Sequence, residues 1–368
     1  VDEVLPGDTF NMNMSAFGRL ATPLHPIFDN IHMETFFFFV PNRLIWDNFQ
    51  KFMGEQENPG DSTDFLVPQV TANVSGWGEE SIFDYMGIPT SVELDNVNAL
   101  HLRAYNLIYN EWFRDENLID SIPINKGDGP DNENDYKIRK RGKRHDYFTS
   151  CLPWPQKGDA VTLPLGQFAP VEPAGSFTPT FQEGDGTDLG FLRVDETDLN
   201  NVFASGTPAS SQPTMTWNDP ALQANLTTAT AATINQIREA FQVQKLLERD
   251  ARSGTRYTEI LSGHFSVTSP DARLQRPEYL GGGYSAVNIN PIAQTTQTLD
   301  TGTPQGNLAA MGTVAARGHG FTKSFVEHGV LIGLACFRAD LTYQQGLNRM
   351  WSRQGRYDFY WPVLAHLD

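Results

Sequence analysis

The apolar pattern of residues 31–40 predicts a strand that is buried on both faces. This run, IHMETFFFFV, is short, aromatic and closed by Pro41. A short, continuous apolar run of this kind is typical of a strand covered above and below rather than of a helix. After it, Asn42 is expected to begin a short helix that ends at Met53, with Gly54 as its stop.

Two segments have apolar positions spaced by three and four residues, which predicts amphipathic helices. The first lies near 96–118 and the second spans 233–252. In the second, Thr233 and Gln236 match a capping box, and Gly254 follows the last helical position. Both helices are expected to be insertions between strands.

Further strands are expected toward the end of the chain. The runs 321–326 and 330–338 have the composition of strands, and 327–329 would join them as a hairpin. The run 356–367, RYDFYWPVLAHL, is interpreted as one more strand. The three glycines 281–283 are interpreted as a flexible turn, because they lack the preceding strand and the following helix of a phosphate-binding loop.

Residues 166–230 lose this periodicity and are rich in Gly, Pro, Ser, Thr and Asn. A structureless loop of this length is usually functional or disordered, so we interpret it as a surface excursion. Strands separated by long loops, without strand–helix alternation, favour a mainly β sandwich or barrel. The expected organisation is a first core segment, residues 1–165, with helical insertions near 42–53 and 96–118, then the excursion 166–230, and a second core segment, residues 231–368, that includes helix 233–252.

Composition narrows the classes of function. The 368-residue chain has a formal net charge of −17, which opposes indiscriminate binding to nucleic acid, so any DNA contact must be local. Two cysteines, Cys151 and Cys336, form no zinc or redox motif, which fits folding in a cytoplasm. No apolar stretch is long enough for membrane insertion. Because the chain begins at Val1 and stops at Asp368 soon after an apolar run, we interpret it as a fragment.

Candidate catalytic and metal-binding residues form no complete motif. His32 and Glu34 are close in sequence but lack the rest of a zinc signature, so they are expected to be ordinary polar groups of a strand. The acidic run 128–135 resembles a calcium loop, but Tyr136 stands where that loop needs glycine and Gly142 where it needs glutamate. We therefore expect no metal, no cofactor and no catalysis, with a looser cation site as the open alternative.

The sharpest electrostatic feature is the basic segment 137–144, which holds six cations in eight residues. These are Lys137, Arg139, Lys140, Arg141, Lys143 and Arg144. Tyr136 precedes the segment, and Tyr147 and Phe148 follow it. Clustered cations favour contact with phosphates, and the aromatic rings beside them can stack on bases. The alternative is a solvated loop that balances the acidic run 128–135.

Six long runs, spread from end to end of the chain, carry a family resemblance. They are PGDTFNMNMSAFGRLATPLHPIFDNI, FFFFVPNRLIWDNFQKFMGE, KRGKRHDYFTSCLPWPQKG, QKLLERDARSGTRYTEIL, HFSVTSPDARLQRPEYLGGG and LTYQQGLNRMWSRQGRYDFYWPVLAHL. Together they closely resemble the major capsid protein of the gokushovirus branch of the microviruses, the Microviridae capsid protein F family. The resemblance implies a structural, non-enzymatic protein with a viral eight-stranded jelly roll and large inserted loops.

The resemblance also implies partners. Copies of the chain would form pentamers and close into a T=1 icosahedral shell around circular single-stranded DNA, assembled in the cytoplasm of a host bacterium and found in the virion. The segment 137–144 is then expected on the inner face of the shell, against genome phosphates. Six cations per subunit are too few to neutralise the genome, so a separate small basic viral protein is expected inside.

The family's most variable region lies between PLGQFAP and the helix that opens at Thr233, and it is similar to an insertion that builds a spike at the three-fold axes. The excursion 166–230 is therefore expected to carry recognition of a host cell-surface receptor. The aromatic residues expected to anchor it are Phe181, Phe191, Phe203 and Trp217. Two other classes stay open at this point: a carbohydrate- or receptor-binding jelly-roll module, and an enzyme, whose nucleophile or metal constellation the sequence does not show.

Overall fold

The computed structural model describes residues 1–21, 27, 29–144, 152, 154–162, 170–174, 180–183, 192–194, 202–204, 215–219, 221–225, 233–268, 275–298, 304–340 and 347–364. The chain folds as two compact units. The first contains Val1–Pro155 together with Ser253–Asp368, and the second contains Gln156–Arg252. No helix within the described ranges is long and apolar enough to cross a lipid bilayer.

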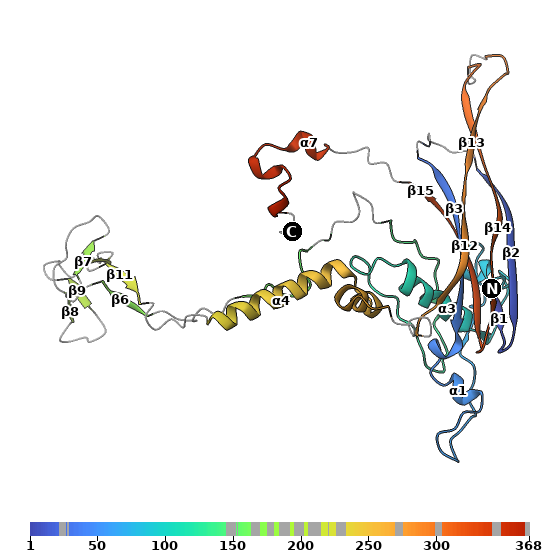
Figure 1. Cartoon of the computed structure of the whole chain (residues 1–368), viewed down its shortest axis with the longest axis horizontal. Helices are drawn as coiled ribbons and strands as arrows, with labels where there is room; N and C mark the ends of the chain where they lie inside the picture. The colour runs from blue at the N-terminus through green and yellow to red at the C-terminus, as the bar shows by residue number, and fades with distance from the viewer. Residues whose placement is uncertain are drawn as a thin grey trace. The chain divides into compact units, whose positions relative to one another are not determined.

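Two antiparallel sheets build the core of the first unit (Figure 1). The four-stranded sheet has the order β1 (Asp2–Val4), β15 (Gly329–Ala339), β3 (Ile31–Pro41) and β12 (Glu278–Ala286). The three-stranded sheet has the order β13 (Asn288–Ala293), β14 (Leu308–Ser324) and β2 (Thr9–Leu20). Apolar side chains of both sheets meet between them. The mainly β prediction is confirmed, while the jelly-roll connectivity stays an expectation.

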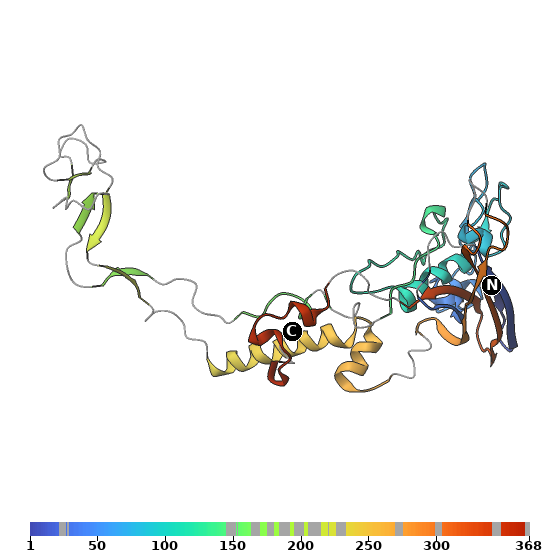
Figure 2. The ribbon, with the colours of Figure 1, turned by 90° about the horizontal axis from the view of Figure 1, so that it is seen from above.

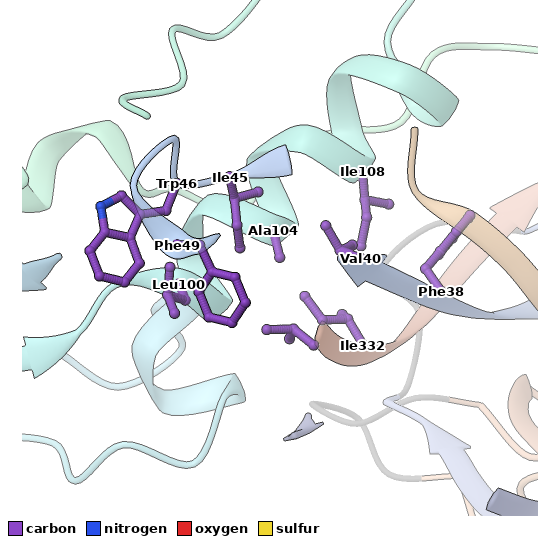
Figure 3. Close-up of a cluster of buried hydrophobic side chains, with 10 residues drawn as sticks. Phe38, Val40, Ile45, Trp46, Phe49, Leu100, Ala104, Ile108 and Ile332 are labelled. Atoms are coloured by element: carbon purple, nitrogen blue, oxygen red, sulfur yellow. The ribbon is translucent and has the colours of Figure 1, made fainter. Parts of the chain in front are cut away.

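Strand β3 is buried on both faces, as its aromatic run predicts. Phe37 and Phe39 pack between the two sheets with Phe321 of β14. On the opposite face, Phe38 and Val40 join a cluster that includes helical residues (Figure 3). That cluster also contains Ile45, Trp46, Phe49, Leu100, Ala104, Ile108, Val330 and Ile332. Because side chains alternate across a strand, four consecutive phenylalanines supply both cores at once.

The three glycines 281–283 lie inside strand β12, so the predicted flexible turn is wrong. The physical reason is close packing on both sides of the strand. A Cβ atom on Gly282 would lie 2.0 Å from the carbonyl oxygen of Thr35, and one on Gly283 would lie 2.2 Å from Cδ2 of His319. Glycine is therefore needed here, because the backbone of β3 and the side chain of His319 approach strand β12 closely.

The predicted hairpin between 321–326 and 330–338 is also wrong. Strand β14 ends at Ser324 and β15 begins at Gly329, but the two strands belong to different sheets. Between them, Phe325 is buried and its ring packs against Phe39, with centroids 4.6 Å apart. The connection therefore crosses the core from one sheet to the other, because burying Phe325 stabilises it more than a hairpin turn in water would.

The run 356–367 was expected to be a strand, but the residues of it that the structure describes form helical turns. These are η6 (Arg356–Asp358) and η7 (Pro362–Leu364), which follow helix α7 (Arg349–Ser352). The carboxylate of Asp358 accepts hydrogen bonds from the backbone N–H groups of Gln354 and Gly355, at 2.9 and 2.7 Å. This side-chain bond closes a local turn and competes with extension of the backbone.

The helical insertion predicted at 42–53 is two separate turns, η1 (Asn42–Leu44) and α1 (Phe49–Phe52). Between them, Ile45 and Trp46 are both fully buried. A surface helix buries one stripe, so two consecutive buried residues favour a break in the helix. The single helix from Asn42 to Met53 is therefore a wrong prediction, although its aromatic side chains do face the core.

The second insertion is helical but shorter than the predicted 96–118. It consists of α3 (Leu100–Ile108), which continues into the π-helical turn η2 (Tyr109–Phe113). The Oδ1 atom of Asn98 accepts a hydrogen bond from the backbone N–H of Leu100 at 2.9 Å and so marks the start. The shorter elements of this unit are β4 (Gln69–Val70), α2 (Ile82–Tyr85), β5 (Val97–Asn98), η3 (Glu133–Asp135), α5 (Tyr257–Ile260) and η5 (Leu261–Phe265).

The second unit consists of nested strand pairs and one long helix (Figure 2). Its pairs are β6 (Val171–Pro173) with β11 (Leu222–Ala224), β7 (Thr180–Glu183) with β10 (Met215–Asp219), and β8 (Leu192–Val194) with β9 (Val202–Ala204). Helix α4 (Ile234–Ser253) begins with the predicted capping box, since the backbone N–H of Thr233 donates to Gln236 Oε1 at 2.8 Å and that of Gln236 donates to Thr233 Oγ1 at 3.2 Å. The excursion therefore leaves and returns as an antiparallel ribbon.

Candidate nucleic-acid interface

The basic segment 137–144 is a strip without regular secondary structure that lies along helix α3 and its continuation η2. Three hydrogen bonds tie its backbone to helix residues four positions apart: Arg139 N–H to Tyr105 Oη at 3.0 Å, Tyr109 Oη to Lys140 O at 3.2 Å, and Gly142 N–H to Phe113 O at 2.8 Å. Residues four apart lie on one side of a helix. The strip is therefore held along a single stripe of the helix.

Two arginines of the strip bind one buried carboxylate. Glu34 lies in the middle of β3 and is 7% exposed. Arg141 donates to one of its carboxylate oxygens through Nη1, and Arg144 donates to the other through Nη2. Arg144 also places Nη1 3.5 Å from Oδ1 of Asp340, just beyond strand β15. We call this group the Glu34 node.

Aromatic rings and a third arginine surround the Glu34 node. The guanidinium of Arg141 lies 4.9 Å from the ring centroid of Phe36 and 5.3 Å from that of Phe113. From strand β15, Arg338 donates through Nη2 to the carbonyl oxygen of Gly142 at 2.6 Å. Burial lowers the pKa of Arg338, and the positive charge of Arg141 lowers it further. The strip is thus fixed to the sheet as well as to the helix.

Opposing effects set the pKa of Glu34. Its burial disfavours the charged form and by itself raises the pKa. The hydrogen bonds and positive charges of Arg141 and Arg144 act in the opposite direction and together outweigh burial, so the pKa lies below its usual value. Glu34 is therefore charged at neutral pH and holds both guanidinium groups.

The lysines of the strip are not part of this node. Lys137, Lys140 and Lys143 are exposed, and within the described ranges of the chain none of them forms an ion pair with a carboxylate. Arg139 is half-buried, and its Nε atom has no hydrogen-bond partner among the described residues. The structure thus places all six predicted cations on one strip, on which Arg141 and Arg144 bind Glu34 and the three lysines are exposed.

The acidic run 128–135 finds its partners elsewhere. Asp131 binds the buried side chain of Arg103 with two bonds of 2.6 and 2.7 Å. Asp128 accepts a hydrogen bond from Trp46 Nε1 at 2.7 Å, and Glu133 accepts one from Trp77 Nε1 at 3.0 Å. Among the residues that the structure describes, no group of three or more His, Cys, Asp or Glu side chains is arranged to hold a metal ion. The run therefore serves to attach its own loop to the core.

Comparisons with known proteins identify the family. The family model described as capsid protein (F protein) matches residues 1–368, the whole chain. The chain belongs to the phage capsid F protein family. The capsid protein VP1 of Bdellovibrio phage phiMH2K is 51% identical over 378 residues, covering 100% of this chain and 70% of that protein. The capsid protein VP1 of Chlamydia phage 1 is 40% identical over 429 residues, and that of Spiroplasma virus 4 is 36% identical over 392 residues. These span 100% and 99% of this chain and 72% and 70% of the respective relatives.

This capsid protein is a major structural subunit of a phage shell and not an enzyme, as the sequence resemblance predicts. Membership of the family places it in the virion, in an oligomeric shell. Its relatives come from gokushovirus-like phages. Contacts between identical copies are therefore essential to its function, and each copy must offer surfaces to its neighbours.

The predicted spike residues of this capsid protein all belong to the second unit. Phe181 and Trp217 occupy opposite positions in the β7–β10 pair, and Trp217 is half-buried. Phe203 lies in β9, opposite Arg193 of β8. Phe191 lies outside the described residues, as do the side chains of Phe181 and Phe203. Their role as anchors of a spike stays a prediction.

Sequence reasoning missed the residues that hold the basic strip. It considered Glu34 only together with His32, as a candidate metal pair. In the structure His32 instead contacts Asp340 Oδ2 at 3.2 Å and Tyr284 Oη at 3.0 Å, while Glu34 binds two arginines. One signal was present: a lone carboxylate in the middle of an aromatic strand must find a cation, because an unpaired buried charge is very costly.

Proposed function

We propose that this subunit helps to form an icosahedral shell around circular single-stranded DNA, and that its basic strip 137–144 contacts the genome. The observation that carries the proposal is the row of exposed lysines on a strip whose backbone is fixed to helix and sheet. A subunit with a net charge of −17 approaches a polyanion only where its cations are concentrated. The inner face of the shell is the place for that contact.

The partners follow from the same charge balance. Six cations per subunit, two of which share the single negative charge of Glu34, leave too little positive charge for a whole genome. We therefore expect a small basic viral protein or polyamines inside the shell. Folding and assembly into pentamers and shells are expected in the cytoplasm of the host bacterium, where a free thiol such as that of Cys336 stays reduced.

Lysine footprinting tests the DNA contact without changing the sequence. Full and empty particles would be treated with an amine-acetylating reagent, and the modified positions read by mass spectrometry. Lys137, Lys140 and Lys143 are expected to be protected in full particles and reactive in empty ones once the reagent has entered. Lys51 and Lys126, also exposed, serve as controls whose reactivity does not depend on DNA. Equal modification of the three lysines in both kinds of particle would contradict the proposal.

A second proposed role, attachment to the host, belongs to the second unit. The supporting observation is its nested antiparallel ribbon, which is built from its own strands and holds the low-periodicity region of the sequence. Such a separate element tolerates variation without disturbing the core, which suits recognition of a cell-surface receptor. We expect the end of the ribbon that contains β8 and β9 to carry the recognition surface.

The strand register gives a clean deletion for this role. Pro173 and Leu222 are cross-strand partners in the β6–β11 pair, so their Cα atoms lie about 5 Å apart. Replacing residues 174–221 with a short glycine linker should therefore leave the rest of the chain in place. The particles are expected to assemble and to retain DNA but to adsorb poorly to host cells. Adsorption at the normal rate would argue against an attachment role.

A further inference from the structure

We infer that Glu34 positions the basic strip for phosphate binding. The lysines then contact DNA, while Arg141 and Arg144 hold the strip to strand β3. This inference rests on the proposed DNA contact and deepens it. It names the chemistry of the recognised group, the phosphate backbone of single-stranded DNA. Five of the six cations of the strip thus fall into two sets with different tasks, the three lysines and the two arginines that bind Glu34.

The backbone of Glu34 is held rigidly within the four-stranded sheet. Its strand is central in the four-stranded sheet, because Glu34 has a neighbour on each side: Cys336 of β15 and Tyr284 of β12. The flanking residues Met33 and Thr35 are buried as well. The backbone of Glu34 therefore cannot shift to follow a ligand, and the carboxylate is a fixed point for whatever binds it.

Glu34 and the DNA phosphates would compete for the two arginines. An arginine that moved to a phosphate would leave the Glu34 carboxylate, whose side chain is only 9% exposed, without that counter-charge. If both arginines moved, the buried carboxylate would be left unpaired, which costs more than exposed phosphate contacts return. Arg141 also packs over two aromatic rings, which it would have to leave. Both effects keep Arg141 and Arg144 bound to the Glu34 carboxylate.

The three lysines are regularly spaced. Lys137, Lys140 and Lys143 recur at every third position of the strip, and each is exposed. Three residues of chain can span up to about 10 Å, which is enough for neighbouring lysines to reach different phosphates. A lysine is a compact, hydrated charge on a flexible stem, which suits contacts with phosphate that do not depend on base sequence. The backbone bonds to the helix between these positions keep the row in place.

The test compares variants of the full-length capsid protein in the binding of a polydeoxythymidine probe of about 30 nucleotides, long enough to cover several phosphate contacts, at several salt concentrations. Glu34→Gln keeps all six cations and removes only the positioning charge. If Glu34 acts as inferred, the slope of log K against log salt becomes shallower, and Glu34→Asp restores it partially. If the arginines contact the phosphates, removing their competing carboxylate frees them, and the slope becomes steeper. The two mechanisms thus predict opposite signs.

A variant that changes the three lysines provides a second test, which does not depend on whether the Glu34 variant folds. The triple change Lys137→Gln, Lys140→Gln and Lys143→Gln is expected to lower the slope by about 2, since each contact with single-stranded DNA contributes about 0.7. Its thermal unfolding midpoint should not change. The matched control Lys51→Gln, Lys126→Gln and Lys245→Gln removes three exposed lysines elsewhere and should leave the slope unchanged.

The outcomes test separately the division of tasks between arginines and lysines and the proposed DNA contact itself. A full loss of slope in Arg141→Gln/Arg144→Gln, with no loss in the lysine triple variant, overturns the division of tasks but keeps the strip as the DNA contact. A slope that is identical in all variants overturns the proposed DNA contact itself. A steeper slope in Glu34→Gln overturns the positioning role.

Discussion

Two ion-pair centres attach loops to the core of the first unit, and they do so in opposite ways. At one centre the charge on the rigid element is a cation: Arg103 of helix α3 binds Asp131, and their side chains are 0% and 2% exposed. At the other it is an anion: Glu34 of β3 binds Arg141 and Arg144, whose side chains are 26% and 47% exposed. Both use a charge on a rigid element to hold an irregular segment.

The two centres differ in how much charged surface remains accessible to other partners. Arg103 also donates to the carbonyl oxygens of Ile45 and Gly127, at 3.1 and 2.8 Å, while Asp131 accepts the hydroxyl of Tyr136 at 2.5 Å. This centre is sealed from solvent and satisfied within the chain, so its role is structural. The Glu34 node keeps guanidinium surface in contact with water and carries exposed lysines beside it. A closed centre stabilises a fold, whereas an open one also presents charge.

The largest effect is expected at the closed centre. Arg103→Met leaves the Asp131 carboxylate buried without its cation, and the free energy of unfolding should fall by about 3–5 kcal/mol. Urea unfolding followed by tryptophan fluorescence measures the change. The double variant Arg103→Met/Asp131→Leu removes both charges and should recover much of the loss. A double variant no more stable than the single one would show that the hydrogen bonds, and not the unpaired charge, dominate.

A smaller effect is expected when the buried charge of the open node is removed. Glu34→Gln should lower the free energy of unfolding by roughly 1–3 kcal/mol, as for loss of a buried hydrogen-bonding partner. The loss is smaller than at Arg103 because the two arginines can turn toward water. The same urea experiment provides the comparison. Equal losses at the two centres would mean that the exposed fractions of the arginines do not govern the energetics.

Acid should weaken the open node in a predictable direction. The pKa of Glu34 is lowered in the folded state, so its contribution is fully present above the ordinary carboxyl pKa of about 4.3 and is lost as the pH falls toward the folded value. The stability difference between the natural chain and Glu34→Gln should therefore be constant near pH 7 and shrink below about pH 4. Urea unfolding at both pH values checks this. A difference that grows in acid would reverse the assigned sign.

The smallest effect is expected at the outer edge of the node. Arg144→Gln removes an ion pair whose arginine side chain is 47% exposed, so water screens much of the interaction. The expected loss is under about 1 kcal/mol. Arg141→Gln should cost more, because Arg141 is less exposed and also packs on Phe36 and Phe113. The ranking of these two single variants in thermal melts is the measurement, and a reversed order would contradict it.

Local patterns were enough for several elements. The aromatic run of β3 predicts a strand buried on both faces because side-chain alternation is a property of any strand. The capping box at Thr233 predicts the start of α4 because its bonds join residues three positions apart. The mainly β class and the capsid family followed from strand composition and from long runs of matching residues.

Other features could not be predicted from local patterns, because the contacts that set them join residues far apart in the chain. Gly282 lies within a strand since Thr35 approaches it from a much earlier strand, and no local pattern records that approach. Glu34 and Arg141 are 107 positions apart, so charge clustering alone marked the basic strip but not its division. Which residues are charged, apolar or turn-forming can be read from the amino-acid sequence alone. Which charges are neutralised inside the fold and which stay exposed depends on how the chain crosses itself, since burial and pairing are properties of neighbours in space.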